Sequence, residues 1–288
     1  MATFSERFLE LPDDLVIKVN GSKDVQTFLG IGRCVVEVLE LEIGQLWECP
    51  NILDFGCGLG RVLKPLSDRA PYSKLVGFDI DVAMLDACRF LLDDQKIRLV
   101  SSTASLPDAS FDLVFAISVF THLDTSIDLW LKEINRLIRP NGRALLTYHD
   151  ETLFAEMVVA GQIADRALTD IALQERFIVG KGSEEGGAAM GTFLTTKAWE
   201  ALVSPHFEVL VTTPRGLFGH QSYSLLRKPD AARKSSGDNT KSLITELREV
   251  KEREIRYRDK SVREYLDMRK INHVQATELI ELRKKLTR

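Results

Sequence analysis

The stretch Leu53-Asp54-Phe55-Gly56-Cys57-Gly58-Leu59-Gly60-Arg61 places three glycines between two segments of different character. A short apolar run from Asn51 to Phe55 precedes the glycines, and a segment typical of a helix follows from Arg61 to Leu66. This order predicts a buried strand, a tight loop and a helix. Glycines in such a loop allow positive φ and let a ligand approach the backbone, while the helix points free N–H groups at the loop.

The spacing of these glycines separates the loop from two familiar nucleotide-binding motifs. The dinucleotide fingerprint G-x-G-x-x-G would need its third glycine at Arg61, and no Gly-Lys-Ser/Thr of a P-loop follows. An acidic residue, Asp79, ends the next predicted strand about 20 residues later, where a carboxylate accepts ribose hydroxyls in Rossmann-like sheets. The alternative is a turn loop followed by a helix that Asp79 or Asp81 caps.

Outward from this loop, predicted strands alternate with predicted helices. Strands are expected at 51–55, 74–79, 97–100, 111–117 and 143–148, and helices at 61–66, 82–92 and 127–138. The strands are continuous apolar runs and show no period-2 alternation, which is typical of a parallel sheet buried on both faces.

Composition narrows the class of protein. Of 288 residues, 44% are apolar and 28% are charged, as in globular proteins. No apolar run approaches the ~20 residues that span a bilayer, and the N-terminus lacks a signal-peptide pattern. The four cysteines form no C-x-x-C pair, which favours a reducing, cytoplasmic compartment over a disulfide framework or a zinc site.

Charge is distributed unevenly and indicates a boundary near residue 230. Residues 1–230 carry 22 Lys+Arg against 32 Asp+Glu, a net charge of −10, and residues 231–288 carry 16 against 10, a net charge of +6. We expect an N-terminal helical segment at 1–45, a linker at 229–239 and a long charged helix at 240–288. That tail either stands solvated or pairs into a coiled coil, and so a homo-oligomer, through Leu279, Leu282 and Leu286.

Five segments of the chain together resemble the class I S-adenosylmethionine-dependent methyltransferases. They are Leu53 to Arg61, Gly77-Phe78-Asp79-Ile80-Asp81, Leu106-Pro107 with Ser110 to Val114, Ser118-Val119-Phe120-Thr121-His122-Leu123, and Glu133 to Gly142. The resemblance implies a Rossmann-like α/β domain at 46–228 with seven strands, six parallel and one antiparallel, and helices on both faces. The two strands still missing would be 206–212 and 221–227.

The same resemblance implies S-adenosylmethionine as cofactor and assigns residues to it. Its methionine part would lie along Asp54, Gly56, Gly58 and Gly60, while Asp79 would bind the ribose and Ile80 would face the adenine. Cys57, Ser102 and Ser118 are assigned to the same site; Ser102 stands where the family usually has an acidic residue that contacts the adenine amino group.

Candidate catalytic groups follow the ends of the fourth and fifth predicted strands, the edge at which open α/β sheets bind ligands. They are His122 and His149, each of which could act as a general base toward an oxygen nucleophile, and Asp150 or Glu151 could orient His149. We expect His220 and Gln221 to contact the substrate, and residues 151–194 to form a substrate cap. No His, Asp or Glu spacing predicts a metal site.

The leading hypothesis is a methyltransferase for a small-molecule or glycan-type acceptor, with transfer to oxygen. The alternative is a catalytically weak cofactor-binding domain that recruits partners through its tail. Two observations argue against nucleic acid as the substrate. Residues 1–230 carry a net charge of −10, and the sequence has Ile117-Ser118-Val119-Phe120 where enzymes that methylate base amino groups have an Asn/Asp-Pro-Pro-Tyr/Phe motif.

Overall fold

A computed structural model describes residues 2–92, 96–164, 167–180 and 190–230. The predicted tail at 240–288, with its coiled-coil alternative, and most of the predicted linker lie outside the described residues. Within the described part, every helix is too short or too polar to cross a bilayer.

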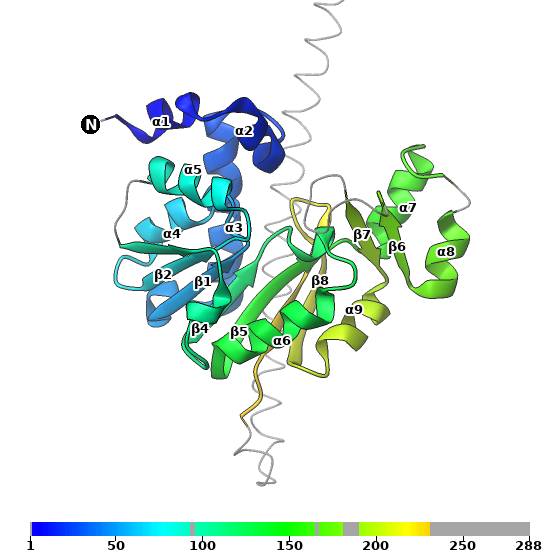
Figure 1. The fold of residues 1–288 in the computed structure, drawn as a ribbon. Helices are drawn as coiled ribbons and strands as arrows, with labels where there is room; N and C mark the ends of the chain where they lie inside the picture. The colour runs from blue at the N-terminus through cyan, green and yellow to red at the C-terminus, as the bar shows by residue number, and fades with distance from the viewer. Residues whose placement is uncertain (1, 93–95, 165–166, 181–189, 231–288) are drawn as a thin grey trace, which may run out of the picture. The chain divides into compact units, whose positions relative to one another are not determined.

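A seven-stranded sheet forms the centre of the described part (Figure 1). The strands follow the order β3-β2-β1-β4-β5-β9-β8, and β9 runs antiparallel to both of its neighbours. Their bounds are β1 Asn51–Phe55, β2 Lys74–Phe78, β3 Ile97–Val100, β4 Phe111–Ala116, β5 Ile138–Tyr148, β8 Glu208–Leu217 and β9 Gln221–Arg227. This confirms the predicted fold class, with six parallel strands and one antiparallel strand.

Helices cover both faces of the sheet. On one face, α6 (Ile127–Leu137) and α9 (Thr196–Val203) pack against the strands around the fully buried Trp199. Opposite them lie α3 (Val25–Ile43), α4 (Leu63–Arg69) and α5 (Val82–Leu92). The Tyr223 hydroxyl of β9 reaches across to α3 and donates to the Glu42 carboxylate at 2.7 Å. Short 3-10 turns occur at Leu46–Glu48, Thr103–Ser105 and Phe120–His122.

Two short helices precede this core and pack onto it. They are α1 (Phe4–Glu10), which opens with a capping box between Thr3 and Glu6, and α2 (Asp13–Asn20). The rings of Phe8 and Phe28 pack with their centroids 5.0 Å apart and their planes tilted by 54°, and their cluster includes Met84 of α5. The N-terminal helices therefore share a hydrophobic core with the sheet domain.

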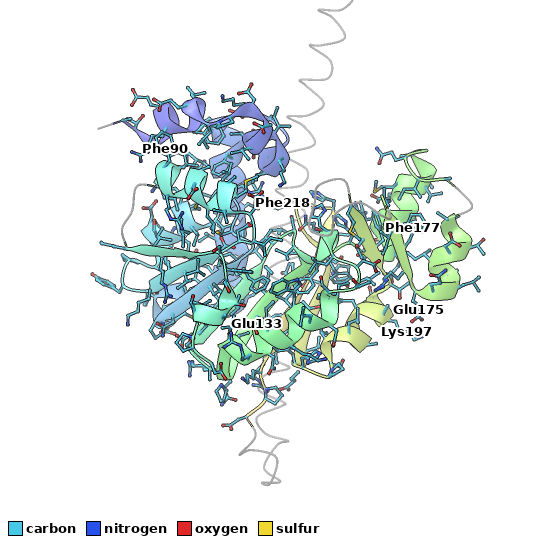
Figure 2. All side chains as sticks on the ribbon, viewed as in Figure 1. Phe90, Glu133, Glu175, Phe177, Lys197 and Phe218 are labelled. Carbon is cyan, nitrogen blue, oxygen red and sulfur yellow. The ribbon has the colours of Figure 1, made fainter. Side chains whose placement is uncertain are left out.

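The segment between β5 and β8 adds a small layer of its own. It contains α7 (Glu151–Val159), α8 (Ala167–Gln174) and a hairpin of β6 (Arg176–Val179) with β7 (Gly191–Leu194). Sequence analysis predicted a substrate cap over residues 151–194, of which residues 165–166 and 181–189 lie outside the described residues. Lys197 of α9 pairs with Glu175 beside the hairpin at 2.5 Å (Figure 2).

Three predicted boundaries shift in the structure. The helix expected from Arg61 begins at Leu63, which leaves Arg61 in the loop. The fifth strand begins at Ile138, because Phe111 pairs with Ile138 before the register shifts. The strand expected from His206 begins at Glu208, and the His206 Nε2 atom instead lies 2.9 Å from the Asp128 carboxylate.

Candidate functional site

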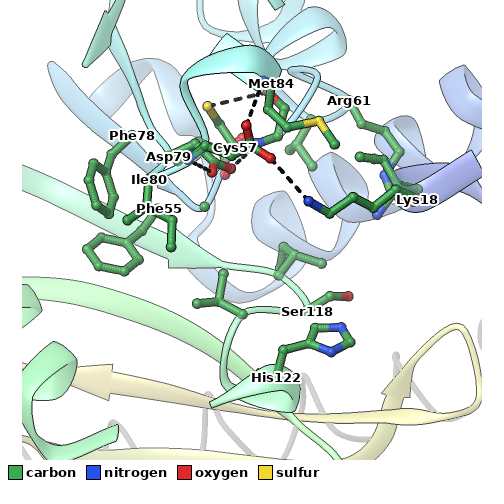
Figure 3. A pocket seen from close by; sticks show the side chains of 18 of the residues that line it. Lys18, Phe55, Cys57, Arg61, Phe78, Asp79, Ile80, Met84, Ser118 and His122 are labelled. Carbon is green, nitrogen blue, oxygen red and sulfur yellow. Dashed lines mark hydrogen bonds and ion pairs between the residues drawn. The ribbon is translucent and has the colours of Figure 1, made fainter. Parts of the chain in front are cut away.

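A pocket of about 490 Å³ opens at the carboxyl ends of β1, β2 and β4 (Figure 3). Because β1 lies between β2 and β4, the connections from neighbouring strands leave in opposite directions there. Open α/β sheets bind ligands at this kind of switch point. The volume is within the range of small-ligand sites.

The glycine loop forms the floor of the pocket, and two of its glycines have physical reasons to be glycine. Gly56 has φ +82°, and a Cβ there would lie 2.4 Å from the Val119 side chain. Gly60 has φ +74°, and a Cβ there would lie 2.7 Å from Cys88 Sγ. Gly60 lies outside the residues that line the pocket, so the structure gives it a role in packing the loop against α5.

Asp79 lies at the end of β2 with its carboxylate against the loop. One carboxylate oxygen accepts the Gly58 N–H at 2.8 Å, and the other accepts the Asp81 N–H at 2.9 Å. Burial raises the pKa of Asp79 above its ordinary value. This carboxylate holds the loop in shape and also faces the pocket, so it stays available to a ligand's hydroxyl groups.

Asp54 and Arg61 supply opposite charges at the deep side of the pocket. Asp54 is 3% exposed, and its buried Oδ2 atom has no hydrogen-bond partner among the described residues. Burial raises the pKa of Asp54 well above its ordinary value, and the nearby Asp79 raises it further. Burial lowers the pKa of Arg61, and the negative charge of the nearby Asp54 partly raises it again. A buried carboxylate atom without a donor is costly, so the site fits a cationic ligand group.

Helix α2 forms a wall that sequence analysis did not anticipate. Lys18 and Val19 both line the pocket. The Lys18 ammonium lies 3.1 Å from the Asp81 carboxylate, and Arg61 donates to the Val19 carbonyl at 2.9 Å. A segment more than 30 residues ahead of the glycine loop thereby closes the pocket.

Opposite Asp79, the wall after β4 is shaped by Ser118 (Figure 3). Ser118 has φ +61°, which is uncommon for a residue with a side chain. Its N–H donates to the Thr147 hydroxyl at 2.8 Å, and its hydroxyl accepts from Gln221 Nε2 at 2.6 Å. Gln221 is 5% exposed, and its Oε1 atom has no hydrogen-bond partner in the described part of the chain.

The two candidate catalytic histidines occupy different depths. His122 lines the pocket, and its Nδ1 donates to the Met190 carbonyl at 2.5 Å, which leaves Nε2 as the acceptor when the ring is neutral. His149 follows β5 and is not among the residues that line the pocket. The centroid of its ring lies 5.2 Å from that of the Phe193 ring. Burial, together with the nearby His122 and His220, lowers the pKa of His149 to about 4. The ring is therefore neutral at physiological pH.

The two carboxylates expected to orient His149 accept hydrogen bonds from other groups. Asp150 caps α7 by accepting the N–H groups of Thr152 and Leu153, and it also accepts the Ser222 hydroxyl. Glu151 accepts the N–H and hydroxyl of Thr196. The His149 Nδ1 atom has no hydrogen-bond partner among the described residues, so neither carboxylate bonds to that atom.

The remaining predicted residues lie around this site or beyond it. Cys57 and Ile80 line the pocket. Ser102 does not: its exposed hydroxyl accepts the Ala104 N–H at 3.3 Å and caps a 3-10 turn. His220 is exposed at the β8–β9 turn and bonds the Phe218 carbonyl. The described residues contain no group of three His, Cys, Asp or Glu side chains arranged for a metal ion.

Comparison with known proteins shows which proteins this chain resembles. A family model described as a methyltransferase domain matches residues 53–146, the segment that holds the glycine loop, Asp79 and Ser118. This match supports a class I methyltransferase domain in this part of the chain. Two similar curated proteins are malonyl-[acyl-carrier protein] O-methyltransferases, from Legionella pneumophila (35% identical over 120 residues) and Hahella chejuensis (34% over 111 residues).

These alignments cover 40% and 37% of this chain, and the chain spans about two fifths of each relative's length (42% and 39%). Among solved structures, a Burkholderia thailandensis 1,6-didemethyltoxoflavin-N1-methyltransferase is similar with a TM-score of 0.51 and 20% identity, covering 80% of this chain and 92% of that chain. That structure contains bound 1,6-didemethyltoxoflavin and S-adenosylhomocysteine. The likeness supports the methyltransferase fold.

The pocket of this methyltransferase domain suits a ligand with an amino-acid end and a ribose. The Asp54 carboxylate and the Arg61 guanidinium match the ammonium and carboxylate of a zwitterion. Asp79 faces the same space for a diol, and Ile80, 60% exposed, offers an apolar surface for a base. S-adenosylmethionine has all of these groups, so the residues present fit it.

Proposed function

We propose that this domain binds S-adenosylmethionine and transfers its methyl group to an oxygen atom of a small-molecule or glycan-type acceptor in the cytoplasm. The observation that carries the proposal is the buried, unpartnered Asp54 Oδ2 atom opposite Arg61, beside Asp79. The cofactor, when bound, supplies a methyl group on a positively charged sulfur. Two similar proteins are O-methyltransferases, which supports oxygen as the acceptor atom.

The chain's own residues would bind, orient and exclude water. Asp54 and Arg61 would hold the charged end of the ligand, and Asp79 the ribose, while α2 closes the pocket. His122 reaches the pocket with Nε2 free to accept a proton, which makes it the stronger candidate for a general base. With a pKa of about 4, His149 would take a proton from a phenol of pKa ~10 uphill by about 8 kcal/mol.

Isothermal titration of the full chain with S-adenosylhomocysteine tests binding. We expect one site per chain, and Asp79→Ala to weaken it by about 1.5–3 kcal/mol, the loss of a hydrogen bond to a charged group. Asp86→Asn on the exposed face of α5 is the control and should bind normally. Undiminished affinity in Asp79→Ala would contradict the ribose assignment.

Turnover separates an enzyme from a domain that only binds the cofactor. If His122 acts as a base, His122→Ala should lower kcat by about 10²–10⁴-fold and leave cofactor affinity intact. Cofactor binding without methyl transfer to any hydroxyl acceptor would favour the alternative, an interaction module. Full turnover in His122→Ala would show that positioning alone drives the reaction.

A further inference from the structure

The last turn of helix α2 borders the pocket, and two polar contacts tie it to the sheet domain. Arg61 of the glycine loop donates to the Val19 carbonyl at 2.9 Å, and the Lys18 ammonium lies 3.1 Å from the Asp81 carboxylate (Figure 3). The Val19 carbonyl is among the last four of the helix, which have no partner inside it. Arg61 therefore caps the C-terminal end of α2 from a distant part of the chain.

Helix α2 depends on such contacts for its order. It has eight residues, and an isolated helix of that length is marginal in water because few hydrogen bonds offset the cost of starting it. Its one buried side chain is Val16, while Ile17 beside it is 51% exposed. With so little apolar burial, the two polar contacts of its last turn carry much of what keeps α2 in place.

Arg61 has donors left for a ligand. A guanidinium carries five N–H groups in a fixed plane. Within the described ranges of the chain, the Val19 carbonyl accepts one of them, and the others have no hydrogen-bond partner. Arg61 lines the pocket near the Asp54 carboxylate, so these N–H groups can reach a bound molecule. A carboxylate matches the fork of a guanidinium and forms the stronger, charge-assisted kind of hydrogen bond.

We propose that Arg61 is a positioning residue that links the ligand to α2: a carboxylate bound in the pocket fixes the guanidinium in the orientation that caps the helix at Val19. The inference rests on the proposed function, since S-adenosylmethionine brings the carboxylate. The linkage is reciprocal, so an ordered α2 also holds Arg61 for the carboxylate. One wall of the pocket thus responds to the amino-acid end of the ligand, and a ligand without a carboxylate leaves α2 as it is in the free chain.

Hydrogen exchange of the α2 amides tests this linkage on the full chain. S-adenosylhomocysteine is compared with its decarboxylated form, which keeps the adenosine, the thioether and the ammonium. Each ligand is used at the same multiple of its own Kd, so that both stabilise the folded state equally. We expect S-adenosylhomocysteine to slow exchange in α2 about 5-fold or more beyond the decarboxylated ligand, the lower end of coupling between two sites. Helix α7, which has no residue in the pocket, should respond equally to both.

Three variants localise the effect. Arg61→Met keeps an apolar stem and removes every donor, so α2 should then exchange alike with the two ligands. Arg69→Met is the matched control, because it makes the same change in an exposed arginine of α4 that pairs with Glu40, and it should keep the difference. Lys18→Met breaks the other contact and should speed exchange with both ligands while keeping their ratio. Binding of the decarboxylated ligand, which needs no donor from Arg61, shows that each variant is folded.

The outcomes separate this inference from the proposed function. A native chain that does not bind S-adenosylhomocysteine would contradict the proposed function itself. If it binds, three results overturn the linkage alone: equal slowing of α2 by the two ligands, slowing of α2 no greater than that of α7, or a difference that persists in Arg61→Met. Loss of the difference in Arg69→Met or Lys18→Met would also overturn it, because the effect would then follow overall stability or the contact at Asp81.

Discussion

Single buried groups at this site titrate away from their ordinary ranges, which makes them accessible to experiment. The Asp54 carboxyl is the clearest case, because burial and the neighbouring Asp79 both raise its pKa. An ammonium group placed beside it would stabilise the carboxylate and lower that pKa again.

Binding of S-adenosylhomocysteine should therefore release protons at acidic pH. The free protein holds a proton on Asp54 up to its raised pKa, and the ligand's ammonium expels it. Release should be largest between the lowered pKa of Asp54 in the complex and its raised pKa in the free protein, and it should vanish at higher pH, where Asp54 is already ionised. Titration calorimetry in two buffers of different ionisation enthalpy measures it, and Asp54→Asn should abolish most of it. Proton uptake by the native chain would rule out this role for Asp54.

The stability of the fold should depend on His149 in a defined pH window. Its folded pKa of about 4 lies below the ordinary value of 6.5, so the unfolded chain binds the proton more tightly. The contribution is fully present above pH 6.5 and is lost as the pH falls toward about 4, by at most about 3 kcal/mol. His122 and His220 add to this depression of the pKa, and Asp150 opposes it.

We expect His149→Phe to flatten this dependence. Between pH 7.5 and pH 5, urea unfolding of the native chain should lose about 2 kcal/mol more stability than the variant does. The phenyl ring retains the packing against Phe193, so both proteins should unfold in one transition. Equal losses in the two proteins would show that His149 titrates normally.

At this scale, sequence analysis found the residues that a short motif carries. Asp54, Gly56 and Asp79 lie within a few positions of the glycine loop or the next strand end. The family resemblance pointed to all three, and spacing also pointed to Asp79. Lys18 and Arg61 were missed because their contribution depends on α2 folding over the loop, which spacing cannot reveal. The functional assignments of all these residues remain predictions until binding is measured.

Among the elements, α1 and α2 connect stability to the pocket. Phe8 of α1 is fully buried against Phe28, while its neighbour Leu9 is 59% exposed. The cluster that Phe8 belongs to also holds Leu59 of the glycine loop. Loss of that packing should loosen both the helix pair and the loop.

Phe8→Ala should cost about 3–5 kcal/mol of unfolding free energy and weaken binding of S-adenosylhomocysteine. Leu9→Ala removes a side chain of similar size from the exposed face and should change stability by less than about 0.5 kcal/mol. Urea denaturation and calorimetry measure the two effects. Normal ligand affinity in a destabilised Phe8→Ala would separate the N-terminal helices from the site.

The elements were predictable where apolar periodicity was strong. Strands β1 to β4 and helices α5 and α6 lie within a residue or two of their expected bounds, because buried strands and amphipathic helices leave a local pattern. Helix α8 and the β6–β7 hairpin were missed, since their short, mixed segments pack mainly on each other and on α7. Their apolar residues form a cluster only in the folded chain, so the sequence shows no local periodicity there.

For the whole molecule, residues 1–235 form one compact unit by their internal contacts. The pocket is lined entirely by residues between Lys18 and Trp130, and the last strand of the sheet ends at Arg227. We therefore expect the domain to fold and to bind its ligand without residues 236–288.

Removal of residues 236–288 should therefore leave the affinity for S-adenosylhomocysteine unchanged within about twofold, since none of the lining residues is lost. Sedimentation of the full and shortened chains tests the predicted pairing of the tail, which should appear as a larger mass of the full chain alone. Loss of ligand binding in the shortened chain would show that the tail supports the fold. Equal monomeric masses would exclude the coiled-coil alternative.

The position of β9 between β5 and β8 has a consequence for synthesis on the ribosome. Trp130 is the last residue of the pocket to emerge, and Gln221, the partner of the Ser118 hydroxyl, is made 91 residues later. At 5–20 residues per second, that delay is about 5–20 s. The nascent chain thus has every lining residue of the pocket well before β9 enters between β5 and β8, and Ser118 gains its hydrogen bond from Gln221 only after β9 has been made.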